Sequence, residues 1–453
     1  MADLLGRLGL GNTLTGNSNK NREHVRRTPP RRQVITPELP HLTAINRDLE
    51  RGNPMRSLFT ALTVGAITLS AVALPTSAAT EQEVEGFVDR LKNGDLDENV
   101  LLYPTADRRV AFAHINAWMP TRPLFPSENP YALTTKIDGD LENVSYQVGG
   151  ETFTVGDFLK REPLMGMAVV KGDTIKLEHY AEDHTPESVW VSFSVTKSFT
   201  STLVGSAIKD GFIGSIDDTV ETYLPRLKGT AYGAVSIKNI LQMSSGVAWN
   251  ENYADPDSDV AKAGTFQGIE LTEYLGTLPQ KHKPGTVFNY NTAESNLLGE
   301  VLRAAVGNSA TDYMNAKVWQ GFGMEHWGNW MQSAPFAGET GGCCISASVR
   351  DYARLGIFVK NGAVNAAGES IVPEGWMTEA TAPSKGYEGY GYKWWLEGGG
   401  TYMAAGIFGQ FIFIDPNNDV VISMHSNAPA AVETNYHAHA DAAMKAIAAS
   451  FGS

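Results

Sequence analysis

Two Ser-x-x-Lys tetrads in the sequence could each supply a nucleophile together with its base. They run from Ser194 to Lys197 and from Ser206 to Lys209. A serine hydroxyl is a poor nucleophile until a neighbouring group removes its proton, and a lysine can do so only while its amine is uncharged. A motif with two fixed residues arises by chance about once or twice in a chain of this length, so the surrounding elements must distinguish the two tetrads.

The two tetrads are distinguished by their places in a helix predicted over about Val195–Lys209. Its apolar residues recur every four positions, and Gly211 follows as a stop signal. Ser194 stands at the helix start, where free backbone N–H groups and the helix dipole favour negative charge, and Lys197 follows one turn later on the same face. Ser206 falls in the last turns, where the residues have ordinary C-terminal helix character. We therefore expect Ser194 as nucleophile and Lys197 as base; the alternative for Ser194 is a plain N-cap serine.

Other residue patterns offer less chemistry. The sequence contains no Gly-x-Ser-x-Gly elbow, so a Ser-His-Asp triad of that kind has no support. Cys343 and Cys344 are adjacent, which excludes a disulfide framework and a multi-cysteine zinc site; we expect buried packing near the site, with a vicinal disulfide as the alternative. His437 and His439 lie about 200° apart on a helix, so they cannot share a metal and are expected as surface or capping residues. The chemistry requires no metal and no organic cofactor.

The coarse secondary structure predicts an α+β fold. Strands at both ends of the domain flank a mainly helical middle, which implies an antiparallel sheet completed by N- and C-terminal segments. No internal repeat is present. The predicted strands are Met165–Val170, Thr174–Tyr180, Met403–Phe408, Phe411–Ile414 and Val420–Met424, and further predicted helices are Asn296–Val306 and Ala431–Ala449.

The N-terminal residues differ in character from the rest. Residues 1–54 are polar, without an apolar period, and are expected to be disordered. Residues 55–79 are typical of a signal peptide, because Arg56 precedes an apolar core over 58–74 and small residues follow Pro75. We expect a periplasmic or secreted protein with its hydrolase domain at 80–453 and Met55 as a candidate translation start. An uncleaved membrane anchor at 58–74 is the alternative.

The charge disfavours nucleic acid as a partner. The formal net charge is −14, and the first 56 residues carry ten Lys/Arg against five Asp/Glu, so the remainder carries −19. An acidic body of this kind repels phosphate backbones. The expected partner is a small-molecule substrate, and the sequence carries no signal for the oligomeric state.

Five blocks of sequence carry a family pattern: Trp190–Phe199, Met243–Pro256, Phe288–Thr292, Val349–Gly356 and Gly406–Gln410. Together they resemble the penicillin-recognising serine hydrolases, and within them the 6-aminohexanoate-dimer (nylon-oligomer) hydrolases and their carboxylesterase relatives. Individually the blocks are weak, but five in the same order are a specific signal. The resemblance implies a β-lactamase/DD-peptidase-like fold, with an antiparallel sheet flanked by helices and a mostly helical inserted domain.

The resemblance also implies the remaining site residues. Tyr290 matches the tyrosine that partners the lysine and passes a proton to the leaving group; alone, it would be a packed aromatic beside Phe288. The backbone amides of Ser194 and Ile407 match an oxyanion hole. Three residues are expected to contact substrate. Tyr253 matches a loop tyrosine that contacts the scissile amide; the alternative is an ordinary loop aromatic. Gly406 and Phe408 lie on the strand that matches the one lining the site.

Two departures from the family pattern bear on the substrate. Thr292 stands where β-lactamases and cell-wall peptidases have Asn in their second motif, and Gly406–Gly409 replaces their Lys-Thr-Gly. The cation that would hold a β-lactam or peptide carboxylate is missing from this strand. We therefore expect hydrolysis of a small ester or amide through an acyl-enzyme. The alternatives are β-lactamase or DD-peptidase activity and a non-catalytic penicillin-binding-like sensor.

Overall fold

The structure is a computed structural model that describes residues 79–97, 99–181 and 183–452. The extension predicted to be disordered (1–54) and, apart from Ala79, the predicted signal peptide or anchor (55–79) lie outside these residues. Within the described ranges, no helix combines the length and apolar character needed to cross a bilayer.

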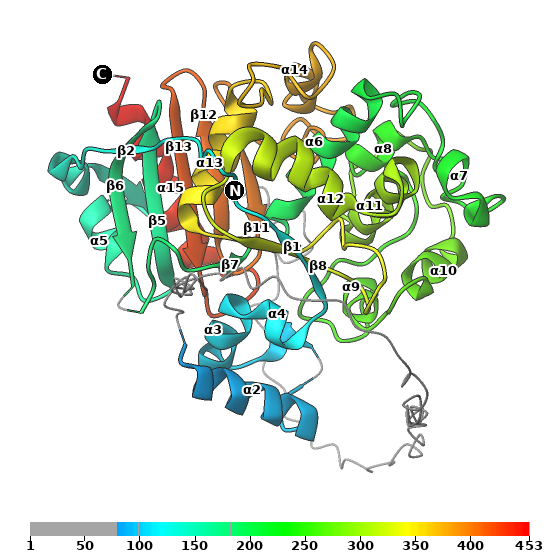
Figure 1. Cartoon of the computed structure of the whole chain (residues 1–453), viewed down its shortest axis with the longest axis horizontal. Helices are drawn as coiled ribbons and strands as arrows, with labels where there is room; N and C mark the ends of the chain where they lie inside the picture. The colour runs from blue at the N-terminus through cyan, green and yellow to red at the C-terminus, as the bar shows by residue number, and fades with distance from the viewer. Residues whose placement is uncertain (1–78, 98, 182, 453) are drawn as a thin grey trace, which may run out of the picture. The chain divides into compact units, whose positions relative to one another are not determined.

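A seven-stranded sheet lies on one side of the described part, on the left in Figure 1. Neighbouring strands are antiparallel, except for a short parallel pair between the last two in the sheet order. The last strand of the chain, β13, pairs with the first strand of the predicted hairpin, β5, so both ends of the domain meet in mid-sheet. The order is β10 (Trp395–Gly398), β11 (Thr401–Gly406), β12 (Gln410–Asp415), β13 (Val420–Ser426), β5 (Leu164–Lys171), β6 (Thr174–Tyr180) and β2 (Thr134–Thr135).

Helices cover both faces of this sheet. For this reason β13 is buried at every position, and β5 is buried at every position except its last. Val421 packs with α6 (Val195–Lys209) and α13 (Val349–Lys360), while its neighbour Ile422 packs with α15 (Thr434–Ser450) on the opposite face. Successive side chains of a strand point to opposite faces, so a strand covered on both sides carries a continuous apolar run. The antiparallel sheet flanked by helices is confirmed.

The helical middle lies between β6 and β10 in the chain and beside the sheet in space (Figure 1). Its central helix, α11 (Thr292–Val306), packs on α6 and α8 (Ile237–Leu241). The other members are α7 (Val220–Tyr223), η3 (Pro225–Leu227), α9 (Asp259–Ala263), α10 (Glu270–Thr277), α12 (Ala310–Met314), η4 (Asn315–Gly323) and α14 (Trp376–Ala380).

A second, four-stranded sheet was not predicted. Its order is β1 (Thr121–Leu124), β8 (Gly328–Met331), β9 (Ile345–Ala347) and β7 (Trp190–Val191). Strands of two to four residues are too short to give an alternating pattern in the sequence. The sheet matters for the site because β7 leads directly into the Ser194 turn. Smaller elements are α2 (Glu81–Asn93), η1 (Val100–Leu102), α3 (Thr105–Ala113), α4 (Ile115–Trp118), η2 (Gly139–Asn143), β3 (Ser145–Val148), β4 (Glu151–Thr154) and α5 (Val155–Leu159).

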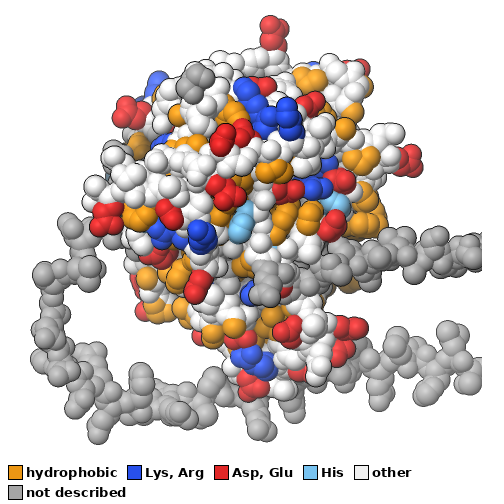
Figure 2. Space-filling model, turned by 90° about the vertical axis from the view of Figure 1, so that its left-hand side faces the viewer, with side chains coloured by type: hydrophobic (Ala, Val, Ile, Leu, Met, Phe, Trp, Pro, Cys, Tyr) orange, Lys and Arg blue, Asp and Glu red, His pale blue; other side chains and the backbone are white. Residues whose placement is uncertain are grey.

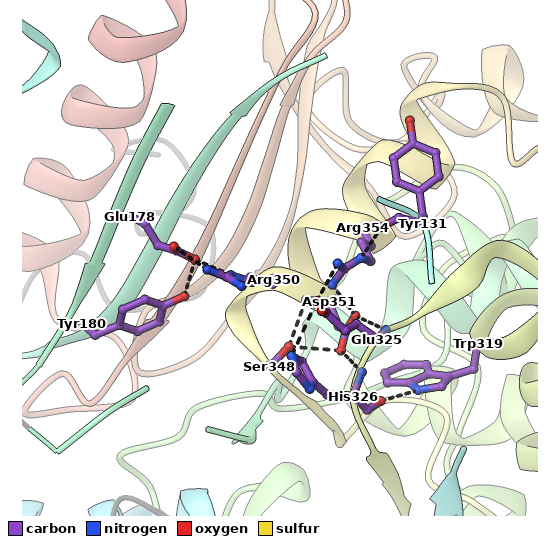
Figure 3. Close-up of polar contacts among 10 residues, drawn as sticks. All are labelled: Tyr131, Glu178, Tyr180, Trp319, Glu325, His326, Ser348, Arg350, Asp351 and Arg354. Carbon is purple, nitrogen blue, oxygen red and sulfur yellow. Dashed lines mark hydrogen bonds and ion pairs between the residues drawn. The ribbon is translucent and has the colours of Figure 1, made fainter. Parts of the chain in front are cut away.

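The block around Val349–Gly356 has a structural role. Asp351 is fully buried in the first turn of α13, where it accepts hydrogen bonds from the backbone N–H groups of Glu325 and His326. Arg354 bonds Asp351 at 3.0 Å and also Glu325, as Figure 3 shows. This network anchors the loop before β8 to α13.

Charged side chains of both signs are interspersed on the face drawn in Figure 2. The net negative charge of the chain is therefore not gathered into one patch on that face.

Candidate active site

Ser194 occupies an accessible turn in an otherwise buried segment. From residue 190 to 207, every residue is buried except Ser194, which is half-buried. Phe193 before it has a φ of 46°, a left-handed conformation that non-glycine residues rarely adopt and that is frequent at functional sites. Ser194 begins α6, but its side chain makes no capping bond. This geometry does not match the plain N-cap alternative and leaves the hydroxyl available.

Lys197 lies one helical turn away and contacts that hydroxyl. Its amine Nζ donates to Ser194 Oγ at 2.8 Å and to the carbonyl of Gly342 at 2.8 Å. The side chain is buried, and burial lowers the pKa of Lys197 to about 8, although the charge of Glu251 partly opposes this. Near neutral pH, part of the population therefore carries a neutral amine, which can accept the proton of the serine hydroxyl.

Tyr290 joins the same cluster from the loop before α11. Its phenol interacts with the Ser194 side chain, which lowers the pKa of Tyr290 against the larger effect of burial, and its ring centroid lies 5.4 Å from Lys197 Nζ. The ring stacks on Trp395, with centroids 5.5 Å apart, which fixes its orientation. Burial raises the pKa of Tyr290, so the phenol keeps its proton and can donate it. The structure thus brings together the three groups that the sequence analysis assigned to catalysis.

The end of β11 approaches the nucleophile turn because Gly406 has no side chain. A Cβ at Gly406 would lie 2.4 Å from the carbonyl oxygen of Ser192, closer than any real contact. Across the described residues, neither the backbone N–H of Ser194 nor that of Ile407 donates a hydrogen bond to another backbone group. Two free N–H groups beside an activated hydroxyl are what an oxyanion hole requires.

Phe408 does not take the place that the sequence analysis expected. Its ring is fully buried and packs against Phe112 and Phe193 at centroid distances of 5.3 and 5.4 Å, with the Arg108 guanidinium 4.7 Å from the ring centroid. The φ of Phe408 is 61°, as the tight turn between β11 and β12 requires. We therefore correct its assignment from substrate contact to packing beneath the nucleophile turn.

The sequence analysis missed Glu251, which organises the loop beside Tyr290. This buried carboxylate accepts the Tyr253 hydroxyl at 2.7 Å and the Thr292 backbone N–H at 2.9 Å. The Trp249 indole N–H and the Thr292 hydroxyl also donate to it. Tyr253 is half-buried at the edge of the site, and its phenol interacts electrostatically with that of Tyr290. A glutamate flanked by Trp249 and Tyr253 was the available sequence signal, but nothing in the pattern indicated burial.

Two more buried ionisable residues were also missed, Lys393 and Glu294, which interact electrostatically with each other and with Glu251. Lys393 interrupts an aromatic run in the sequence, and Glu294 sits in the first turn of α11, where a capping role is the ordinary interpretation.

The weaker candidates lie elsewhere or serve packing. Ser206 is buried, and its hydroxyl accepts a hydrogen bond from Tyr313 at 2.9 Å. Cys343 and Cys344 are joined as a disulfide next to the Gly342 that contacts Lys197. Contrary to expectation, His437 and His439 are buried, because α15 is covered over more of its circumference than its pattern suggested. Among the described residues, no cluster of three or more His, Cys, Asp or Glu could hold a metal.

Comparison with known proteins identifies the class. Residues 154–444 match the beta-lactamase family, which is more than half of the chain. The chain belongs to the beta-lactamase family. It is 28% identical over 294 residues to the 6-aminohexanoate-dimer hydrolase of Paenarthrobacter ureafaciens, covering 59% of this chain and 74% of that one.

Solved structures show the same fold. A proposed 6-aminohexanoate-dimer hydrolase from Bacillus anthracis superposes with a TM-score of 0.69 at 19% identity, over 78% of this chain and 97% of its own. A proposed beta-lactamase from Bacteroides dorei gives 0.52 at 16% identity, over 64% and 97%. The β-lactamase-like fold and the resemblance to 6-aminohexanoate-dimer hydrolases are confirmed. The matched family and the relatives named above are hydrolases.

Proposed function

We propose that this chain is a serine hydrolase that cleaves a small linear amide or ester through an acyl-enzyme, in the manner of the 6-aminohexanoate-dimer hydrolases it resembles. The observation that carries the proposal is the 2.8 Å contact between Lys197 Nζ and Ser194 Oγ, made by a lysine whose pKa burial lowers to about 8. Such a pair supplies what an unactivated serine lacks.

The mechanism follows from the three side chains. Ser194 Oγ attacks the carbonyl carbon while its proton passes to the neutral Lys197 amine. The resulting oxyanion accepts hydrogen bonds from the Ser194 and Ile407 amides. Tyr290 gives its proton to the leaving nitrogen or oxygen and regains one from Lys197, so the leaving group departs neutral. Water then attacks the acyl-enzyme by the reverse proton path, releasing the acid and restoring Ser194.

The choice of a linear amide or ester rests on the lining of the site. Strand β11 ends in Ala405 and Gly406 and offers no cation to a substrate carboxylate, and Lys393 is buried away from solvent. A β-lactam or a peptidoglycan stem would lack its usual electrostatic anchor. The aromatic side chains of Tyr253, Tyr290 and Trp395 favour an extended, largely apolar chain.

We also propose that the protein is exported, as the apolar stretch 58–74 and the small residues after it suggest. The first described helix supports this: Thr80 caps α2 with a reciprocal bond to Glu83, so removal of the residues before about 79 or 80 leaves the helix start intact.

A fluorophosphonate probe tests the nucleophile. We expect the wild-type protein to be labelled and Ser194→Ala to be unlabelled. Ser206→Ala is the matched control, because it removes the serine of the other Ser-x-x-Lys tetrad, and it should label like the wild type. Equal labelling of Ser194→Ala would refute the proposal, and no labelling of the wild type would favour the non-catalytic sensor.

A substrate panel then ranks the activities. We expect turnover of 6-aminohexanoate dimer and of short p-nitrophenyl esters, with little turnover of nitrocefin. Efficient nitrocefin hydrolysis would instead support β-lactamase activity and would overturn the interpretation of the β11 strand.

A further inference from the structure

Three phenylalanine rings interlock beneath the two turns that carry the proposed oxyanion donors. Phe193 directly precedes Ser194 in the chain. In the second turn, Phe408 directly follows Ile407. The rings of Phe193 and Phe408 are buried, with their centroids 5.4 Å apart. Phe112 packs against both of them, at centroid distances of 4.9 and 5.3 Å, so one ring from another part of the chain contacts both turns.

Both turns depend on their surroundings for their conformation. Phe193 and Phe408 have φ of 46° and 61°, in the left-handed region, which is unfavourable for residues other than glycine and persists only where the surrounding structure holds it. The two turns also lie against each other, because a Cβ at Gly406 would come within 3.2 Å of the Phe193 Cβ. The positions of the two donor N–H groups therefore depend on how these rings pack.

The third ring comes from α3, which lies below β7 in Figure 1. There Phe112 also meets Trp190 of β7 edge-on, at a centroid distance of 5.7 Å. Arg108 lies one turn earlier on the same face of the helix. Its buried guanidinium lies 4.7 Å from the centroid of the Phe408 ring and donates to the carbonyl of Ala428 at 2.9 Å. The backbone N–H of Ala428 in turn donates to the carbonyl of Phe408 at 3.1 Å, so two side chains of α3 hold this turn.

We propose that Phe112 of α3 is a positioning residue that sets the separation of the two oxyanion donors. Donors stabilise a developing oxyanion only when they are held in place before the charge forms, within about 0.5 Å of the productive geometry. Phe112 contacts both turns and so fixes the distance between them, while Arg108 secures the second turn to the same helix. Because α3 precedes residues 154–444, which match the family, the family pattern does not assign it this role. The inference rests on the proposed oxyanion hole of Ser194 and Ile407.

The test compares an ester with its thiono analogue, in which sulfur replaces the carbonyl oxygen. Sulfur is larger than oxygen and accepts hydrogen bonds more weakly, so a correctly spaced pair of donors favours the ester. The ratio of kcat/KM for p-nitrophenyl acetate to kcat/KM for its thiono analogue defines the oxygen preference. Phe112→Leu keeps an apolar side chain but removes the ring that spans the two turns. We expect kcat/KM for the ester to fall about 10²-fold and the oxygen preference to fall about tenfold.

Further variants separate positioning from a general loss of packing. Phe408→Leu removes a ring from the other side of the same contact, and we expect it to lower the oxygen preference as well. The double variant Phe112→Leu/Phe408→Leu should lose less than the two single effects combined, because both changes act on one contact. Phe358→Leu is the matched control, since this ring is also fully buried but packs on Phe322, at a centroid distance of 5.3 Å. We expect the control to keep the oxygen preference of the wild type, and circular dichroism confirms that each variant is folded.

Two results would overturn the inference. One is an oxygen preference that stays within about twofold of the wild type in folded Phe112→Leu. The other is an equal fall in Phe358→Leu, which would mean that the loss of any buried ring has this effect. If Phe112→Leu does not fold, the oxygen preference of Phe408→Leu decides. These failures differ from failure of the proposed function, in which the wild type itself would show neither ester turnover nor fluorophosphonate labelling of Ser194.

Discussion

The α-carbon of Gly406 lies against the carbonyl of Ser192, so close that a methyl group at this position would sit 2.4 Å from the oxygen. This contact brings the end of β11 to the turn that holds the candidate nucleophile. The position therefore tolerates glycine alone, for a steric reason that is independent of backbone flexibility.

Gly406→Ala should separate β11 from the Ser194 turn and move the Ile407 amide away from the developing oxyanion. Loss of one oxyanion donor lowers kcat by about 10²- to 10³-fold, so we expect a loss of that order with a smaller change in KM. Steady-state kinetics on a p-nitrophenyl ester measure it. Gly139→Ala is the control, because a Cβ there meets nothing within 4 Å, and it should leave kcat unchanged.

The reaction should accelerate with pH through the titration of Lys197. Because burial lowers the pKa of this amine to about 8, the neutral base is scarce at pH 6 and predominates above pH 9. We expect kcat/KM to rise with an apparent pKa near 8 and to level off above it. A profile that is flat from pH 6 to 9 would argue against Lys197 as the base.

Lys197→Met should remove activity without unfolding the protein. Methionine fills the buried space of the lysine stem but cannot take the serine proton, so we expect kcat to fall by about 10²- to 10⁴-fold. Thermal unfolding should show a stability equal to or above that of the wild type, since a buried amine without a carboxylate partner is itself costly. Near-normal turnover would mean that another group activates Ser194.

Tyr253→Phe should distinguish amides from esters. The Tyr253 hydroxyl donates its proton to Glu251 at 2.7 Å, so its oxygen can only accept a hydrogen bond from a substrate. An amide substrate can donate such a bond through its N–H, whereas an ester has no N–H to donate. We expect amide turnover to fall about tenfold, the effect of about one hydrogen bond, with ester turnover less affected. Equal losses on both substrates would indicate a positional effect of the ring.

Asp351→Asn should affect stability and not chemistry. Asp351 is fully buried and pairs with Arg354 at 3.0 Å, so removing its charge leaves a buried guanidinium partly uncompensated. We expect a loss of about 3 kcal/mol in the free energy of unfolding, with kcat of the folded protein unchanged. Denaturant titration measures the loss. Asp312→Asn, at an exposed first-turn aspartate of α12, should change stability by less than about 0.5 kcal/mol.

The proposed export predicts a defined N-terminus. We expect Edman sequencing of the secreted protein to begin near Ala79 or Thr80, directly before the capped start of α2. Retention of the 58–74 segment in a membrane fraction would instead support the anchor.

The local features of the fold and site followed from the sequence alone. The helix after Ser194 has the predicted bounds of Val195–Lys209, and the hairpin of β5 and β6 lies where predicted, because apolar periodicity and stop signals are local properties. The Ser-x-x-Lys spacing likewise placed Lys197 beside Ser194, since one helical turn fixes their separation.

Only the tertiary structure decided which other groups surround that pair. Glu251, Glu294 and Lys393 are ordinary surface residues by pattern, and their long-range hydrogen-bonding partners lie from 41 to 195 positions away in the chain. The ring of Phe408 points inward because the turn between β11 and β12 packs on Phe112 and Phe193. These contacts join residues far apart in the sequence, so no local periodicity predicts them. Burial and charge are set by long-range packing, so the reactivity of Lys197 is a property of the fold.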